Sequence, residues 1–180
     1  MRRPGGKPAL TDLELGDPNH SHAYAIALLA RRDYSSRELR QKLKARGYLE
    51  HAIEPVIEEL LAMNQINDRR YGSNVVAYRA RRGQGPVRIR NELRKAGVSA
   101  EDVEAAVAGD EDAPDFVQRA RDTRARKFGP EIPKNWKDRA KQARFLQYRG
   151  FSNDHIRAAL DGDLEADSGA NSGSEPDHST

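Results

Sequence analysis

The sequence contains no cysteine, and this absence excludes disulfide bonds and thiolate metal sites. No apolar stretch approaches the roughly 20 residues that a membrane-spanning helix needs. Residues 1–15 also lack the apolar centre of a secretory signal peptide. These absences favour a reducing compartment, and we expect the protein to be cytoplasmic.

Residue clusters typical of enzymes and metal sites are also missing. Residues 83–86 contain two glycines but lack the GxxxxGK[ST] order of a phosphate-binding loop, so they predict a turn and a helix start. His20 and His22 lie in a segment that we expect to be flexible, and His51, His155 and His178 have no second ligand at metal spacing. The sequence therefore predicts a protein that is not an enzyme and has no cofactor and no bound metal.

Apolar residues are scarce, at 37% of the chain against 33% charged residues. Such a ratio suits thin helical units better than a thick two-layer core. No alternating β-branched run of useful length is present, which argues against a sheet.

The charge is segregated along the chain, although the formal total is only +3. The tail from residue 161 contributes −6 and residues 1–21 contribute zero, so residues 22–160 carry +9. A basic body favours a polyanionic partner or an acidic protein surface. A solubilising charged surface is the alternative explanation.

An internal repeat is the strongest pattern in the sequence. Residues 36–57 and 86–107 carry the same apolar positions 50 residues apart. These positions are Leu39, Leu43, Ile53 and Ile57 in the first copy, and Ile89, Leu93, Val103 and Val107 in the second. A fixed period that keeps its apolar positions is typical of tandem units that bury a core by packing together.

A third and weaker copy follows with a shift of 53 residues. Leu146, Gly150, Ile156 and Leu160 match Leu93, Gly97, Val103 and Val107. Gln142 stands where the earlier copies have Leu39 and Ile89.

The repeat predicts an all-α fold, an elongated array of three tandem three-helix repeats of helix-turn-helix type with flexible termini. We assign residues 22–67, 68–109 and 110–161 to the three repeats, 1–21 to a flexible segment and 162–180 to a disordered acidic tail. The nine expected helices are Ala23–Arg32, Arg37–Arg46, Leu49 to about Asn64, Asp68–Arg82, Pro86–Lys95, Ala100–Ala108, Pro114–Phe128, Trp136–Arg149 and Asn153–Leu160.

Local signals mark several helix ends. Ser35 and Glu38 match a capping box, in which each side chain satisfies a backbone donor at the helix start. Gly47 and Gly97 stand where a left-handed residue ends a helix, and Ser99 is expected to cap the next helix.

Basic residues repeat together with the apolar ones. Because each residue advances about 100° around a helix, Arg40 and Lys44 share a face apart from the core, and Arg90 and Arg94 recur at the same offset. A solvated face is the alternative, since common ancestry of the repeats could preserve these charges passively. The third repeat has its own stripe.

Arrayed Lys and Arg side chains can neutralise phosphates or pair with carboxylates. The candidate residues for contact with a partner or with DNA are Arg37, Arg40, Lys44, Arg79, Arg81, Arg82, Arg90, Arg94, Lys137, Lys141 and Arg144.

The aromatic residues are expected to serve the core. Trp136 lies on the apolar side of its helix, whereas Phe145 falls off that side and either packs on the preceding repeat or meets a partner; we favour packing. The six tyrosines are expected to pack with their hydroxyls in water, and stacking on bases is the alternative.

The sequence resembles the RecX regulators of the RecA recombinase over about residues 23–160. The most telling stretches are residues 66–71 (INDRRY), 78–83 (YRARRG) and 92–95 (ELRK) with Gly97, supported by Leu146 and residues 149–151 (RGF) in the last repeat. Each stretch is short, but their order and spacing together are specific.

This resemblance implies a chain that binds RecA and the RecA–single-stranded DNA filament and that restrains strand exchange and coprotease activity. It implies no catalytic residues, and we expect a monomer that does not engage membranes. The competing hypothesis is a helical-repeat nucleic-acid-binding protein that acts without RecA.

Overall fold

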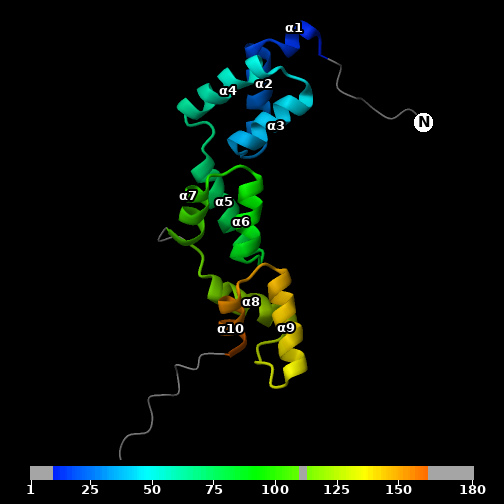
Figure 1. The fold of residues 1–180 in the computed structure, drawn as a ribbon, viewed down its shortest axis with the longest axis vertical. Coiled ribbons are helices and arrows are strands. Elements are labelled where there is room, and N and C mark those ends of the chain that lie inside the picture. The colour runs from blue at the N-terminus through cyan, green and yellow to red at the C-terminus, as the bar shows by residue number, and fades with distance from the viewer. Residues whose placement is uncertain (1–9, 110–112, 162–180) are drawn as a thin grey trace, which may run out of the picture. The chain divides into compact units, whose positions relative to one another are not determined.

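The computed structural model describes residues 10–109 and 113–161. Within these ranges it contains ten α-helices, one short π-helix and no strand (Figure 1), which confirms the predicted all-α class. The elements are α1 (Asp12–Leu15), α2 (Pro18–Leu29), α3 (Ser36–Arg46), α4 (Glu50–Ala62), α5 (Asp68–Arg81), α6 (Pro86–Lys95), α7 (Ala100–Glu104), η1 (Ala105–Gly109), α8 (Phe116–Phe128), α9 (Trp136–Tyr148) and α10 (Asn153–Asp161).

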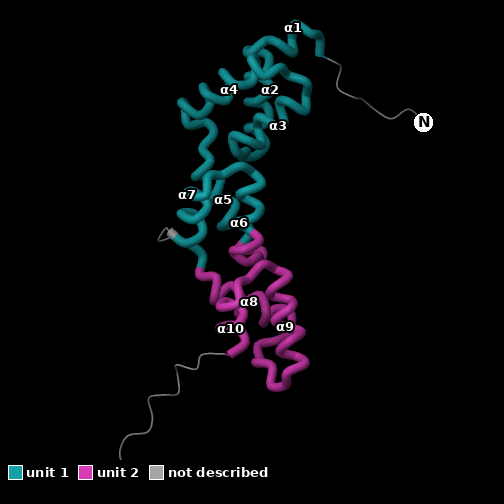
Figure 2. The backbone as a smooth tube through the Cα atoms, in the orientation of Figure 1, with its two compact units in different colours: residues 1–79, 89–114 teal, residues 80–88, 115–180 magenta. Residues whose placement is uncertain are grey.

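The helices of the three predicted repeats are α2–α4, α5–η1 and α8–α10, and in the second of these sets α7 continues directly into η1. The chain forms two compact units (Figure 2). Unit 1 comprises residues 1–79 and 89–114, and unit 2 comprises residues 80–88 and 115–180. The first repeat and most of the second therefore belong to unit 1, whereas the third repeat belongs to unit 2.

The N-terminal segment differs from the expectation of a flexible stretch over residues 1–21. Thr11 and Glu14 form a capping box that starts α1, and α2 begins at Pro18, five residues before the expected start. Leu15 accepts a backbone hydrogen bond from Leu49 at 2.9 Å, and Leu10 packs against the core of unit 1. These contacts order residues 10–21, while residues 1–9 lie outside the described ranges.

The predicted glycine caps are confirmed. Of the two hydrogen bonds of the predicted capping box, the structure confirms the one that the Ser35 side chain accepts. Gly47 and Gly97 have φ values of +106° and +83°, in the left-handed region that suits glycine. Ser35 caps α3 by accepting from the Glu38 backbone at 3.1 Å. The Glu38 carboxylate instead accepts a hydrogen bond from Arg32 Nη1 at 3.1 Å, because an interhelical cation lies within its reach.

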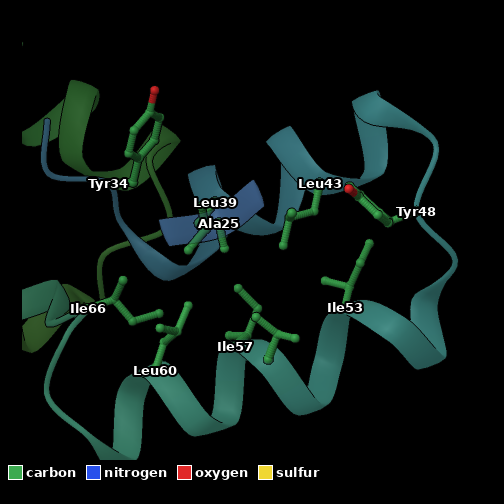
Figure 3. Close-up of a cluster of buried hydrophobic side chains, with 10 residues drawn as sticks. Ala25, Tyr34, Leu39, Leu43, Tyr48, Ile53, Ile57, Leu60 and Ile66 are labelled. Atoms are coloured by element: carbon green, nitrogen blue, oxygen red, sulfur yellow. The ribbon is translucent and has the colours of Figure 1, made fainter. Parts of the chain in front are cut away.

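The core of unit 1 gathers the repeated apolar positions of the first repeat. Leu39 and Leu43 from α3 face Ile53 and Ile57 from α4 and Ala25 from α2 (Figure 3). All five are fully buried. Three helices thus close over one small core, and α3 and α4 contribute to it with the apolar faces that their period predicts.

The equivalent positions of the other two repeats are also buried. In the second repeat Ile89, Leu93 and Val103 are fully buried and Val107 nearly so. In the third repeat Leu146, Ile156 and Leu160 are buried. The periodicity therefore identified the core of each repeat.

Unit 2 packs α8, α9 and α10 against one another. The turn before α6 adds to this packing, because Gly85 donates to the Arg149 carbonyl at 2.9 Å and Val87 donates to the Gly150 carbonyl at 3.0 Å. Gly150, with φ at +88°, allows this approach: a Cβ there would lie 2.8 Å from the backbone nitrogen of Arg88.

The predicted acidic tail, residues 162–180, lies outside the described residues. Among the helices that the structure describes, none is long and apolar enough to cross a membrane.

Candidate partner-binding surfaces

The basic stripe of the first two repeats consists of Arg40 and Lys44, and of Arg90 and Arg94, and its first arginine forms the same ion pair in both repeats. Arg40 on α3 donates through Nε to Glu54 Oε1 at 2.8 Å and through Nη2 to Glu54 Oε2 at 3.0 Å. Arg90 on α6 makes the same two-point contact with Glu104, at 3.0 and 2.9 Å. Both acidic partners follow their arginine by 14 residues, so the repeat conserves a tertiary contact as well as a charge.

The other two residues of the stripe are paired as well. Lys44 Nζ lies 2.8 Å from Glu50 Oε1, and Arg94 lies 3.8 Å from Glu104. The hydrogen bond from Lys44 lowers the pKa of the Glu50 carboxyl, and the hydrogen bond from Arg90 lowers that of Glu104. These carboxylates therefore stay ionised well into the acid range.

Such pairs stabilise the helix packing modestly. The Arg40–Glu54 and Arg90–Glu104 pairs contribute about 0.2–1 kcal/mol each, because water screens the charges. Their two-point geometry fixes the direction of each guanidinium. In the first two repeats the stripe thus joins one helix of a repeat to the next.

A further candidate, Arg79, lies in a cleft of unit 1 with a volume of about 640 Å³. Its Nε donates to Glu92 Oε1 at 3.0 Å. In the same cleft, burial and then the nearby Glu38 carboxylate raise the pKa of Tyr71 to about 12. Arg79 is therefore held by a partner within its own unit, and the Tyr71 hydroxyl stays protonated at neutral pH.

The remaining candidates of the first two repeats lie in different settings. The aliphatic part of Arg37 covers Gly97, where an added Cβ would lie 2.3 Å from Arg37 Cδ. Arg81 and Arg82 are exposed at the end of α5. The Arg82 carbonyl accepts a hydrogen bond from Arg149 at 3.4 Å.

The third repeat lacks the ion pair of the other two. With the shift of 53 residues, Ala143 stands at the position of Arg90, and Arg157 stands at that of Glu104. The cations of the third repeat, Lys137, Lys141 and Arg144, lie instead along α9. Within residues 10–109 and 113–161 they have no carboxylate partner.

These three cations line a groove of unit 2 with a volume of about 730 Å³. Its lining contains no carboxylate and consists of Lys127, Phe128, Trp136, Lys137, Ala140, Lys141, Arg144, Phe145 and Tyr148. We call this surface the aromatic-basic groove. It joins the end of α8 to the length of α9.

Aromatic rings form the apolar part of this groove. Phe145 meets Phe128 edge to face, with ring centroids 5.3 Å apart, so it packs within its own repeat. Lys141 Nζ lies 5.9 Å from the centre of the Phe128 ring, at the outer limit of a cation–π contact. The cations and the rings therefore share one surface.

Two rings of the groove contradict the expectation of core packing. Trp136 is 74% exposed and Tyr148 is 83% exposed. Trp136 is the first residue of α9 and lines the open groove, so its apolar position on the helical wheel does not bury it. Among the other tyrosines, Tyr34, Tyr48 and Tyr71 are buried as expected, whereas Tyr78 is 46% exposed.

Arg124 positions the start of α9. It is buried on α8, and its guanidinium donates to the carbonyls of Glu131 at 2.7 Å and Pro130 at 2.9 Å. Burial lowers the pKa of this guanidinium. These bonds hold the loop that delivers Trp136 to the groove, a role that charge counting along the sequence missed.

Within the described part of the chain, no group of three or more His, Cys, Asp or Glu side chains could hold a metal ion. The candidate functional side chains are therefore at the surface. Unit 1 presents cations that pair with carboxylates. Unit 2 presents a groove with exposed rings and with three cations that have no carboxylate partner within the described residues.

Comparison with known proteins matches all three repeats in order. Family models of the first, second and third three-helix domains of RecX match residues 22–60, 67–107 and 114–160. Regulatory protein RecX of Halorhodospira halophila is 43% identical over 135 residues, which cover 75% of this chain and 83% of that protein. Regulatory protein RecX of Pseudomonas fluorescens is 41% identical over 138 residues, covering 77% and 88%.

Solved structures support the same fold. The crystal structure of RecX from Lactobacillus salivarius aligns with a TM-score of 0.66 at 20% identity, over 81% of this chain and 95% of that one.

Proposed function

The chain belongs to the RecX family, and we propose that it binds RecA and the RecA–single-stranded DNA filament and inhibits strand exchange, ATPase and coprotease activity. It would act in the cytoplasm, in DNA repair, recombination and the SOS response. The observation that carries this proposal is the match of all three RecX domains in order.

In this proposal the protein inhibits RecA by occupying surfaces of the filament and not by catalysing a reaction. A filament offers equivalent surfaces at regular spacing, and a chain of tandem repeats can contact several of them. Linked contacts gain from effective concentration, so each one can be weak. The separate basic faces of the repeats support such a mode.

The candidate residues fall into two groups under this proposal. Arg40 and Arg90 are already neutralised by carboxylates, so a partner would have to compete with Glu54 and Glu104 for them. Lys137, Lys141 and Arg144 have no carboxylate partner within the described residues, so a binding partner meets no such competition there. We therefore assign the main partner contact to the third repeat and a mainly stabilising role to the paired stripe.

A RecA-dependent strand-exchange assay with and without the protein tests the function. We expect product formation to fall as the protein is added, at concentrations that leave single-stranded DNA bare of it when RecA is omitted. Unchanged strand exchange at saturating protein would overturn the proposal.

The second candidate is a nucleic-acid-binding protein that acts without RecA. The exposed rings and cations of the aromatic-basic groove favour it, since such surfaces bind nucleic acid without another protein. Co-sedimentation with preformed RecA filaments, compared with binding to bare single-stranded DNA across a salt series, separates the two. Equal affinity for both would favour the second candidate.

A further inference from the structure

The aromatic-basic groove offers both positive charge and aromatic rings, and one class of ligand matches both. It combines the cations Lys127, Lys137, Lys141 and Arg144 with the exposed rings of Trp136 and Tyr148, and its lining contains no carboxylate. An acidic peptide would satisfy the cations but would leave the exposed faces of Trp136 and Tyr148 without partners. A single-stranded nucleic acid supplies both phosphates and unpaired bases.

The geometry along α9 suits an extended ligand. Trp136 and Tyr148 are 12 residues apart, which corresponds to about 18 Å along a helix axis. Three of the four cations of α9, Lys137, Lys141 and Arg144, lie between them in the sequence and line the same groove. Several nucleotides of a single strand span such a distance, so bases can reach both rings while phosphates meet the cations.

We propose that the aromatic-basic groove of the third repeat binds single-stranded nucleic acid, with Trp136 and Tyr148 as base-stacking platforms and Lys137, Lys141 and Arg144 as phosphate contacts. This binding is independent of base sequence, because every base offers a face for stacking. The proposal rests on the proposed function in one respect only: it assigns the DNA contact within a filament to the third repeat.

The single tryptophan of the chain provides a direct probe, because Trp136 is the only one. Titration of the full chain with oligo(dT) in the absence of RecA should quench Trp136 fluorescence as bases stack on the indole. Anisotropy of a labelled oligo(dT) gives the affinity independently of the tryptophan. Circular dichroism confirms that each variant keeps its helices.

Two double variants with the same change in net charge form the central comparison. Lys137→Glu with Lys141→Glu alters the groove, whereas Lys42→Glu with Lys95→Glu alters exposed positions on α3 and α6. The groove variant should bind oligo(dT) about ten-fold more weakly or worse, and its salt dependence should be less steep by about 1.4. The control variant should stay within about two-fold of the unchanged chain at moderate salt.

Removal of the rings tests stacking separately from charge. Trp136→Ala and Tyr148→Ala should each weaken oligo(dT) binding by about ten-fold while the salt dependence stays the same. Both side chains are largely exposed, so these variants are expected to fold.

The proposal is overturned if oligo(dT) leaves Trp136 fluorescence unchanged and the two double variants bind it equally. It is also overturned if poly-glutamate quenches Trp136 as strongly as oligo(dT) does, since the occupant is then an acidic peptide. Normal inhibition of RecA by a chain that fails to bind oligo(dT) would remove this inference alone. Oligo(dT) binding without any inhibition of RecA would remove the proposed function alone.

Discussion

Arg90 in the second repeat and Ala143 in the third stand at equivalent positions, and the difference separates two kinds of basic surface. Around Arg90 and its counterpart Arg40, each guanidinium is fixed by a carboxylate of the following helix. Around Ala143, no such pair forms, and Lys137, Lys141 and Arg144 of α9 line a groove beside exposed rings. Repeats that share one apolar pattern thus place their positive charge differently.

The comparison shows that a regular basic stripe can take part in helix packing. The first two repeats have the more regular stripe, yet their arginines join helices within the repeat. The third repeat departs most from the pattern, and its groove cations Lys137, Lys141 and Arg144 have no carboxylate partner within the described residues.

Exchange of one core residue between repeats should give the largest effect. Leu39 is fully buried, and Leu39→Gln should destabilise the first repeat by about 3–5 kcal/mol, through lost apolar burial and an unsatisfied amide. Its equivalent in the third repeat, Gln142, is buried with no hydrogen-bond partner for Oε1 within the described residues. Gln142→Leu should therefore stabilise the third repeat by about 1–2 kcal/mol.

Hydrogen exchange resolved by segment measures both changes, since the two compact units need not unfold together. Protection should fall in α3 and α4 for Leu39→Gln and rise in α8–α10 for Gln142→Leu. A loss of protection in Gln142→Leu would show that the amide has a partner that the structure lacks.

The glycines that end the middle helices should respond next, and unequally. Gly47 and Gly150 both have positive φ, so alanine costs about 1 kcal/mol at either position. At Gly150 the added Cβ would also meet the backbone of Arg88 at 2.8 Å, whereas at Gly47 it would meet only a Leu15 methyl at 3.2 Å. Gly150→Ala should cost about 2–4 kcal/mol in total.

Urea denaturation of Gly47→Ala and Gly150→Ala, monitored by the circular dichroism signal of the helices, gives the free energies of unfolding that check this ranking. Equal losses of unfolding free energy in the two variants would mean that the turn at residues 85–88 can move at no energetic cost. The packing of that turn on Gly150 would then contribute little to the stability of unit 2.

The core and caps were predictable from the sequence because they depend on local spacing. Leu39 and Leu43 lie one helical turn apart, and Gly47 follows where a left-handed cap is needed. The pairing of Arg40 with Glu54 was not predictable in this way, since it joins two helices whose crossing depends on the packed core. Exposure of Trp136 was missed for a related reason: helical spacing identifies an apolar side but not whether a neighbour covers it.

A smaller effect is expected from the repeated ion pair. A double-mutant cycle with Arg90→Gln and Glu104→Gln should give a coupling energy of about 0.2–1 kcal/mol. Introduction of the pair into the third repeat, by Ala143→Arg with Arg157→Glu, should give a coupling of similar size. Zero coupling at Arg90 and Glu104 would leave the arginine available to a partner and would weaken the contrast between the repeats.

The smallest effect is a dependence on pH that belongs to unit 1. The lowered pKa of Glu50 and of Glu104 means that their pairs add stability above the ordinary value near 4.5, and that this stability is lost as pH falls through the lowered values. Urea midpoints at about pH 6 and about pH 3.5 should therefore differ more for the unchanged chain than for a Glu50→Gln and Glu104→Gln variant. An identical difference would show that neither pair contributes.

The central claim is that the third repeat, and not the more regular stripe, makes the main partner contact. Its most direct test is the protein concentration that half-inhibits RecA strand exchange, measured for Lys137→Glu with Lys141→Glu and for the charge-matched Lys44→Glu with Arg94→Glu of the stripe. We predict an increase of about ten-fold or more for the first variant and little change for the second. Equal half-inhibiting concentrations in the two variants would contradict the claim.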